Sequence, residues 1–513
     1  MQLVAVFSLF KVYYWVGYDT WTHAAWNEIL VNNEYLFSTM VKEASFPIQH
    51  IAVVVTDVLC NINIHDASLI SVSLPTIILS ITLFIIVKNL TNVQCGLIAM
   101  LVGGLLPPII SWVALSQTTT YCYMLFTVLM LCYWKIKINN HYNRDLYFVV
   151  FLFLFITIIM THAFSSFIIL GIFIAFYLGS IISEHKLFTF EAKLLFVLTS
   201  ILLIYWVVTA WNANASVFEG ILDTALYAVN FNDWGVSNTF QKYVNLAAPF
   251  PLNEFLDKVF LLFIGISALS LIFISLQRRS KEKIPQIFVL LVASIGVIGF
   301  YLGSIFILPG MSDRFGPYCA FFAVLAFSIL LYYHICIAPV RISPSIYALI
   351  TIVLISSLIF LFVGSSTVNQ DNSIWVSETT VSNGVTIQEC AAINTIIQHI
   401  PVIESCTYDH ALSPVYGYYA YLHKYQESAV IPPALYHYPS YIDWGDINAS
   451  SKNYLIFRSK LLADPTYQLF KYGTTSQRKF TQKLQLPSNF DQQLSGKYDV
   501  IYSNSKIDLY KLA

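Results

Sequence analysis

The stretch GYDTWTHAAWNEIL, residues 17–30, sets an aspartate, a histidine and a glutamate directly after sixteen mostly apolar residues. In a helix that begins near Asp19, the side chains of Asp19, His23 and Asn27 follow at intervals of four residues and share one face. Trp26 then turns toward lipid or a neighbouring helix. The sequence therefore predicts a polar helix face with a carboxylate at its leading end.

Asp19 has two compatible roles open to it. An aspartate at the start of a helix accepts hydrogen bonds from the first amides and suits the positive end of the helix dipole. The same carboxylate, held at a membrane surface, could act as a catalytic base. The spacing alone leaves both roles open.

The composition is that of a polytopic membrane protein. Of 513 residues, 57% are hydrophobic and 11% are charged, against about 25% charged in soluble domains. The net charge of −1 supplies no basic field for nucleic acid, so any anion site must be built locally.

Apolar runs of about 20 residues, the length that spans a bilayer, set the expected architecture. Residues 1–16 would rise only about 24 Å as a helix, so either the first helix is short or Met1 is not the native start. With this run, the sequence predicts a polytopic α-helical membrane protein of about eleven transmembrane helices. The other ten runs are 67–88, 93–115, 119–137, 145–161, 163–183, 192–211, 256–277, 284–306, 318–339 and 344–364.

The distribution of Lys and Arg predicts the orientation of the chain. Alternate connections between the spans hold eleven of these residues, and the other connections hold only Lys42, Lys242, Lys258 and Arg314. Cytoplasmic loops are the ones enriched in Lys and Arg. The amino terminus is therefore predicted to be cytoplasmic, and the external parts are predicted to be the loops 17–66, 212–255 and 307–317 and all residues after 365.

From about residue 366 the sequence is typical of a water-soluble domain. CAAINTIIQHI (390–400) predicts an amphipathic helix, and YLIFRS (454–459), YDVIYSN (498–504) and IDLYKL (507–512) predict strands. We expect a transmembrane domain over 1–365, with external loops 17–66 and 212–255, and a small extracytoplasmic α/β domain over 366–513.

The first external loop carries a family resemblance. Its segments GYDTWTH (17–23) and ASFPIQHIAVVVTDVL (44–59) belong to two predicted helices that lie at the membrane interface. With about eleven spans and a trailing external domain, this plan resembles the GT-C class of membrane glycosyltransferases, which includes protein mannosyltransferases and oligosaccharyltransferases. The resemblance implies transfer of a sugar from a polyprenyl (dolichyl or undecaprenyl) phosphate to a glycan, lipid or protein acceptor on the outer face.

In that class an aspartate of the first external loop is the catalytic base, and the resemblance places this role on Asp19. Because a lipid phosphate is already a good leaving group, the enzyme chiefly takes a proton from the acceptor hydroxyl and holds the departing phosphate. One carboxylate suffices for an inverting displacement, whereas a retaining route would use a second carboxylate about 5 Å away.

The phosphate would be held by one of the few external cations. Arg314, in PGMSDRFGPY (309–318), lies between two predicted spans, and a guanidinium matches phosphate oxygens in bidentate fashion. The resemblance gives this task to an arginine in a late external loop. Lys242 is the second candidate, and the competing interpretation is that Arg314 only extends its charge to lipid headgroups.

Four further polar residues are candidates for the substrate site: His23, His50, Gln117 and His162. His162, in MTHAFSS (160–166), falls in a very short external turn, so it must lie near the mouth of any cavity. A polar side chain hydrogen-bonded to nearby backbone is the competing interpretation. His23 could also bind phosphate, or join Asp19 on a metal.

The sequence favours a reaction that requires no metal cofactor. Oligosaccharyltransferases of the class carry acidic DxD pairs and a WWDYG motif, but here the first loop has DTW (19–21) and the soluble domain has only YIDWGD (441–446). The eight cysteines lack the spacing of thiolate metal sites. Cys390 and Cys406 could form a disulfide if their domain faces an oxidising compartment.

A transporter or flippase of lipid-linked sugars is the main alternative function. It predicts ionisable residues in mid-membrane and broken helices in two matching halves. The predicted spans hold few such residues, Pro107-Pro108 is their main interruption, and no halves match. A scaffold whose external domain binds a partner is a third interpretation, but it leaves Asp19 and Arg314 without a role.

Overall fold

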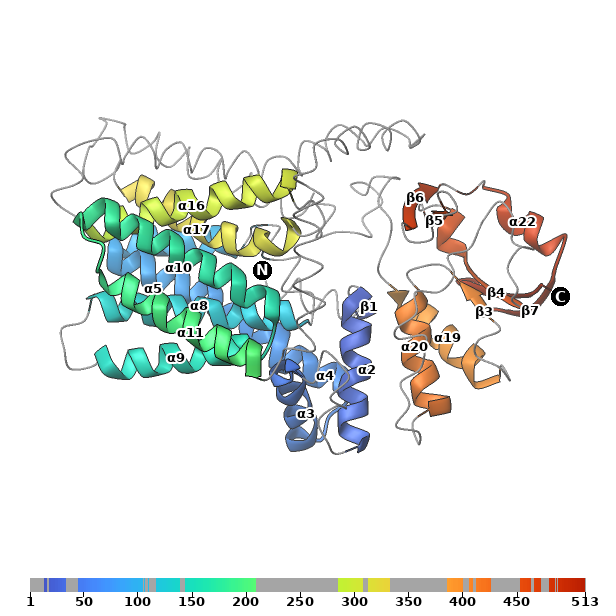
Figure 1. The fold of residues 1–513 in the computed structure, drawn as a ribbon. Helices are drawn as coiled ribbons and strands as arrows, with labels where there is room; N and C mark the ends of the chain where they lie inside the picture. The colour runs from blue at the N-terminus through green and yellow to red at the C-terminus, as the bar shows by residue number, and fades with distance from the viewer. Residues whose placement is uncertain are drawn as a thin grey trace.

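The chain is mainly helical, with a small sheet near its carboxyl end (Figure 1). The computed structural model describes residues 13–15, 18–33, 45–104, 106, 109, 117–138, 144–208, 285–307, 312–332, 385–399, 406–408, 412–425, 453–462, 466–471, 479–484, 486 and 488–512.

A bundle of apolar helices makes up the larger body of the molecule (Figure 1). Three described helical segments are long and apolar enough to cross a membrane: Ile64–Leu90, Ala163–Ile182 and Phe190–Val207. The helices of the bundle are α5 (Ile77–Leu90), α6 (Val93–Gly103), α8 (Thr118–Ile138), α9 (Arg144–Ile159), α10 (Ala163–Glu184), α11 (Phe190–Val208), α16 (Pro285–Ile307) and α17 (Ser312–Tyr332).

Two helix boundaries differ from the sequence predictions. The helix predicted over 93–115 ends at Gly103, and α17 begins at Ser312 rather than at 318. Hydropathy alone could not place the start of α17, because its first turn is polar. Arg314 therefore lies in the first turn of a helix and not in a loop.

The predicted helix over residues 1–16 is wrong for its last part. Tyr13–Trp15 form strand β1, which pairs antiparallel with β2 (Val385–Thr386). Three successive aromatic residues suit an extended strand, and the partner that completes the ladder comes from far along the chain. The pairing joins the amino-terminal region to the start of the carboxyl-terminal domain.

Three helices follow β1 before the bundle begins. They are α2 (Tyr18–Asn33), α3 (Ile48–Cys60) and α4 (Ile64–Ser68). A π-helical turn (Leu69–Ser73) and a 3₁₀ turn (Leu74–Thr76) connect α4 to α5. The break falls at Pro75, which has no amide hydrogen to donate to the preceding turn.

The carboxyl-terminal domain contains a four-stranded sheet of order β3-β4-β8-β7, with β3 and β4 parallel and the other pairs antiparallel. Alternate residues of β4 face different cores: Ile456 packs with the α19 residue Ile393, and Phe457 packs with the α22 residue Phe490. The strand is therefore covered on both sides, as its continuous apolar run indicates. The elements are α19 (Ile387–His399), β3 (Cys406–Tyr408), α20 (Ser413–Ala420), β4 (Tyr454–Arg458), α22 (Phe490–Ser495), β7 (Asp499–Ser503) and β8 (Ile507–Lys511), with a separate hairpin of β5 (Thr466–Lys471) and β6 (Lys479–Leu484).

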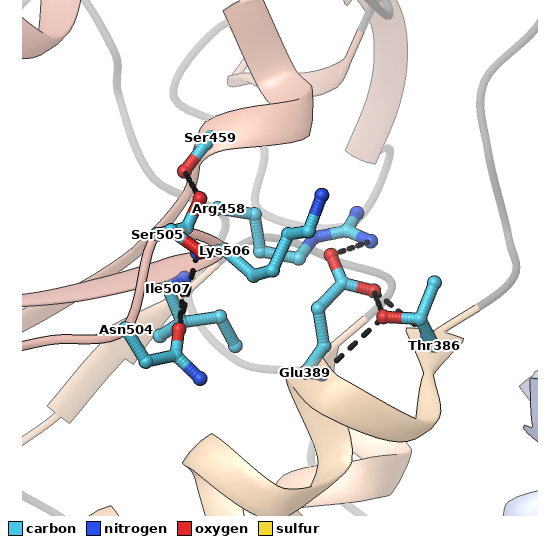
Figure 2. Close-up of polar contacts among 8 residues, drawn as sticks. All are labelled: Thr386, Glu389, Arg458, Ser459, Asn504, Ser505, Lys506 and Ile507. Carbon is cyan, nitrogen blue, oxygen red and sulfur yellow. Dashed lines mark hydrogen bonds and ion pairs between the residues drawn. The ribbon is translucent and has the colours of Figure 1, made fainter.

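A buried ion pair joins α19 to this sheet (Figure 2). Glu389 and Arg458 approach to 3.7 Å, and each side chain is only 2% exposed. The other Glu389 carboxylate oxygen accepts hydrogen bonds from the backbone N–H and hydroxyl of Thr386, at 2.7 and 3.0 Å. Thr386 and Glu389 thus form a reciprocal cap at the start of α19.

Helix α2 lies between α3 and α4 on one side and α20 on the other (Figure 1). Trp21 meets Tyr418 edge to face, with ring centroids 5.5 Å apart, and Trp26 packs with Tyr421. The Tyr418 hydroxyl donates a hydrogen bond of 3.0 Å to Glu28. The carboxyl-terminal domain therefore packs directly against the helix that carries Asp19.

A second polar cluster lies where α8 ends and α11 begins. Glu191 pairs with Lys137 and accepts hydrogen bonds from Tyr133, at 3.1 Å, and Ser180, at 2.9 Å. Arg144 lies over the adjacent ring of Phe190, at 5.3 Å. This end of the bundle carries the basic residues of the predicted cytoplasmic connections.

Candidate functional site

Asp19 lies in the first turn of α2, one residue after the helix begins at Tyr18. It is thus not the residue that precedes the helix, and the predicted N-cap position is wrong by two residues. A carboxylate in a first turn still suits the positive end of the helix dipole. The structure describes the backbone of Asp19 and not its side chain, so its catalytic role stays a prediction.

The predicted polar face of α2 contacts α3 through two histidines. His50 donates a hydrogen bond of 2.7 Å from Nδ1 to the Asn27 amide oxygen, and the His23 and His50 rings lie 5.2 Å apart. Burial, and then the proximity of His23, hold the pKa of His50 well below its usual range. The His50 imidazole is therefore neutral at physiological pH, and its Nε2 carries the lone pair.

Gln117 joins the same face from the start of α8. Its amide lies 3.4 Å from the hydroxyl of Thr20, the neighbour of Asp19 in α2. Three of the four predicted substrate-site residues, His23, His50 and Gln117, therefore surround the first turns of α2.

His162 lies in the turn between α9 and α10, as predicted, and forms the N-cap of α10. Its Nδ1 accepts a hydrogen bond from the backbone N–H of Ser165, at 3.2 Å. A hydrogen bond to nearby backbone was the competing interpretation for this residue, and the structure shows it.

Arg314 lies beside the same turn. Its guanidinium carbon is 5.8 Å from the centre of the Phe164 ring, two residues beyond His162, and Phe164 meets Phe315 edge to face at 5.4 Å. Arg314 is half-buried. The aromatic side chains hold the guanidinium at the start of α17, close to the start of α10.

Two long-range hydrogen bonds bring these helix ends together. The backbone N–H of Ile48, at the start of α3, donates to the carbonyl of Met160, and the Tyr123 hydroxyl of α8 donates to the carbonyl of Pro317 in α17. The starts of α3, α8, α10 and α17 therefore meet at one end of the bundle. Lys242 lies outside the described residues.

Sequence reasoning missed two polar side chains at this end, Gln49 and Trp206. Gln49 is fully buried between Ile48 and His50. The signal available was a glutamine beside a histidine inside the apolar run FPIQHIAVVV. Trp206 gave no signal, because a tryptophan near the end of a membrane helix is common for other reasons.

The sequence favoured a reaction without a metal, left open a metal shared by Asp19 and His23, and offered Cys390 and Cys406 as a possible disulfide. Among the described residues, no three His, Cys, Asp or Glu side chains gather closely enough to hold a metal ion. Cys390 and Cys406 are both buried and are not joined to each other in the structure. Burial, and then the Glu389 charge, raise the pKa of the Cys390 thiol well above its ordinary value. The disulfide stays a prediction for an oxidising compartment.

The chain is similar to solved structures, although no protein-family model and no curated sequence matches it. The crystal structure of the Archaeoglobus fulgidus oligosaccharyltransferase with Zn and sulfate aligns with a TM-score of 0.54 and 10% identity, over 94% of this chain and 70% of that one. The same protein tethered to an acceptor peptide containing the NVT sequon aligns with a TM-score of 0.51 and 11% identity, over 91% and 70%.

ArnT from Cupriavidus metallidurans in the apo state aligns over all of this chain and 96% of its own, with a TM-score of 0.50 and 12% identity. Both neighbours are GT-C glycosyltransferases. At these identities the likeness establishes the fold, and the predicted GT-C resemblance is confirmed at that level.

Proposed function

We propose that this GT-C-fold chain is a membrane glycosyltransferase that moves a sugar from a polyprenyl phosphate to a glycan, lipid or protein acceptor on the outer face. The observation that carries the proposal is the meeting, at one end of an apolar bundle, of the first turn of α2 with His50, Gln117 and the Arg314 helix end. A base, neutral polar groups and a cation are thereby brought to one region.

The proposed reaction is a single inverting displacement with Asp19 as the base. The acceptor hydroxyl transfers its proton to the Asp19 carboxylate while its oxygen forms a bond to the anomeric carbon. The bond from that carbon to the phosphate oxygen breaks, and the phosphate leaves with the electron pair. Arg314, with Lys242 as a second candidate, would hold the departing phosphate. No divalent metal takes part in this scheme.

The proposed membrane arrangement has a cytoplasmic amino terminus and an extracytoplasmic domain over 366–513, and its first span would be shorter than predicted because residues 13–15 form β1. Two observations support it. The Lys137, Arg144 and Glu191 cluster lies at the helix ends opposite to those that carry the candidate site. On α3, His50 faces the protein while Val58 and Leu59 are 65% and 79% exposed, as expected for a helix lying in the interface.

Replacement of the proposed base tests the function. Asp19→Asn should lower transfer from radiolabelled undecaprenyl- or dolichyl-phosphate sugars by about 10²–10⁴-fold, the usual contribution of a positioned base. Binding of the lipid donor should remain, because the amide keeps the size of the side chain. Asp57→Asn, on α3 in the same loop, is the matched control and should keep its activity.

Near-full transfer by Asp19→Asn would refute the assignment of the base. Movement of the labelled lipid across the bilayer without cleavage of its sugar would instead support the flippase alternative.

A further inference from the structure

Gln49 has a buried side chain that the fold leaves unsatisfied. Its amide is 0% exposed, and among the described residues neither its nitrogen nor its oxygen has a hydrogen-bond partner. Burial removes the hydrogen bonds of such an amide to water, and without a partner in the protein no new hydrogen bonds replace them. Buried amides in native proteins are therefore normally paired. The buried Gln49 amide is therefore available to bind a ligand.

Trp206 presents a second unpaired group beside the same segment. Its indole Nε1 is buried and has no hydrogen-bond partner in the part of the chain that the structure describes, although a buried indole N–H normally finds one. The indole packs against the Phe46–Ala163 contact and meets Phe167 edge to face at 4.4 Å. Phe46 precedes Gln49 by three residues, so the segment that carries Gln49 also supplies one side of the contact that Trp206 packs against.

Three hydrogen bonds join residues 45–50 to other elements at the end of the bundle that carries the candidate site. The Tyr205 hydroxyl of α11 donates a hydrogen bond to the carbonyl of Ser45, and the Ile48 amide of α3 bonds to Met160 in the turn before α10. His50, next to Gln49, bonds to Asn27 of α2. The segments that carry Gln49 and Trp206 are thus at the same end of the bundle as the candidate site.

The unpaired atoms define the chemistry of the missing partner. An amide nitrogen and an indole nitrogen donate, whereas the amide oxygen only accepts. A deprotonated phosphate accepts but does not donate, and a polyprenyl chain does neither. Sugar hydroxyls do both, and aromatic rings such as Phe46 and Trp206 offer an apolar surface to the C–H face of a sugar ring.

We propose that Gln49 and Trp206 bind hydroxyl groups of the transferred sugar and so determine which neutral sugar the protein accepts. The proposal rests on the proposed glycosyltransferase function and adds a recognition site to it.

Thermal stabilisation of the purified full chain in detergent tests the proposal without requiring transfer. The probes are undecaprenyl phosphate alone and undecaprenyl phosphate carrying mannose, glucose or galactose. For the wild type we expect bare undecaprenyl phosphate to raise Tm, and at least one sugar-bearing lipid to raise it further. Gln49→Met and Trp206→Phe should lose this further increase, with at least about tenfold weaker binding of the sugar-bearing lipid, and should keep the increase due to the bare lipid.

Two variants serve as matched controls. Gln388→Met removes an exposed amide in the carboxyl-terminal domain, and Trp134→Phe removes another buried, unpaired indole N–H in the half of α8 that carries Lys137. Both variants should keep the increase in Tm due to bare undecaprenyl phosphate and the further increase due to the sugar-bearing lipid.

Each remaining outcome contradicts the proposal in a distinguishable way. If Gln49→Met keeps the sugar-dependent increase, the amide is paired by ordered water and the recognition site is refuted while the function stands. If no lipid stabilises the wild type, the proposed function fails and the recognition site fails with it.

Discussion

Glu389 and Arg458 form a buried ion pair within the carboxyl-terminal domain. Both charges are buried, and Glu389 also caps α19 through Thr386 (Figure 2). Removing one partner of a buried pair leaves the other charge uncompensated, whereas replacing both with apolar groups can be nearly neutral.

Glu389→Ala should therefore destabilise the domain by about 3–5 kcal/mol. The double variant Glu389→Gln, Arg458→Met keeps an acceptor for the cap and removes both charges, so it should recover most of the loss. The measurement is alkylation of the buried Cys390 against temperature, read by mass spectrometry. If the double variant is destabilised as much as Glu389→Ala, the unpaired charge on Arg458 does not destabilise the fold, and the prediction is wrong.

At the scale of elements, the contact between α2 and α20 joins the carboxyl-terminal domain to the helix that carries Asp19. Burial raises the pKa of the Glu28 carboxyl, the Tyr418 hydrogen bond opposes this, and the Asp57 charge raises the pKa further. Because the pKa of the Glu28 carboxyl is higher in the folded state than in the unfolded state, this group stabilises the fold at low pH, where it is protonated. The contribution is lost as the pH rises from the ordinary glutamate pKa of about 4.3 through the higher folded-state pKa.

Glu28→Gln keeps an acceptor for Tyr418 and removes the charge. We expect this variant to melt at a higher temperature than the wild type at pH 7.5 and to show a smaller change between pH 5 and 7.5. Tyr418→Phe should destabilise the protein by about 1.5–3 kcal/mol at pH 7.5, since it removes a hydrogen bond to a charged group. Asp66→Asn, a more exposed carboxylate, is the control. A wild-type pH slope in Glu28→Gln would contradict the role of Glu28.

Local patterns predicted the elements whose signal lies within one segment. The helix over α19, the strands β4, β7 and β8, and the polar face of α2 with His23 and Asn27 follow from periodicity. Strand β1 and the Glu28–Tyr418 bond were not predictable in this way, because their partners lie hundreds of residues away. Topology predicted that Gln117, His162 and Arg314 share one end of the bundle, but it could not predict which residues each of them contacts.

At the scale of the whole molecule, the proposed orientation can be tested by labelling in intact cells. Cys60, at the exposed end of α3, should react with a membrane-impermeant maleimide from outside. In a Cys60→Ser background, Lys186→Cys in the connection between α10 and α11 should react only after the membrane is permeabilised. External labelling at position 186 would invert the proposed topology.

The pairing of β1 with β2 has a consequence for the timing of synthesis. Trp15 and Val385 are 370 positions apart, so a ribosome adding about 5–20 residues per second needs roughly 20–75 seconds to supply the second strand after the first. The bundle helices emerge during this interval, whereas α2 waits for β2 and α20. The helix bearing Asp19 therefore packs into place late, and a nascent chain lacks the completed candidate site until the residues of β2 and α20 have been made.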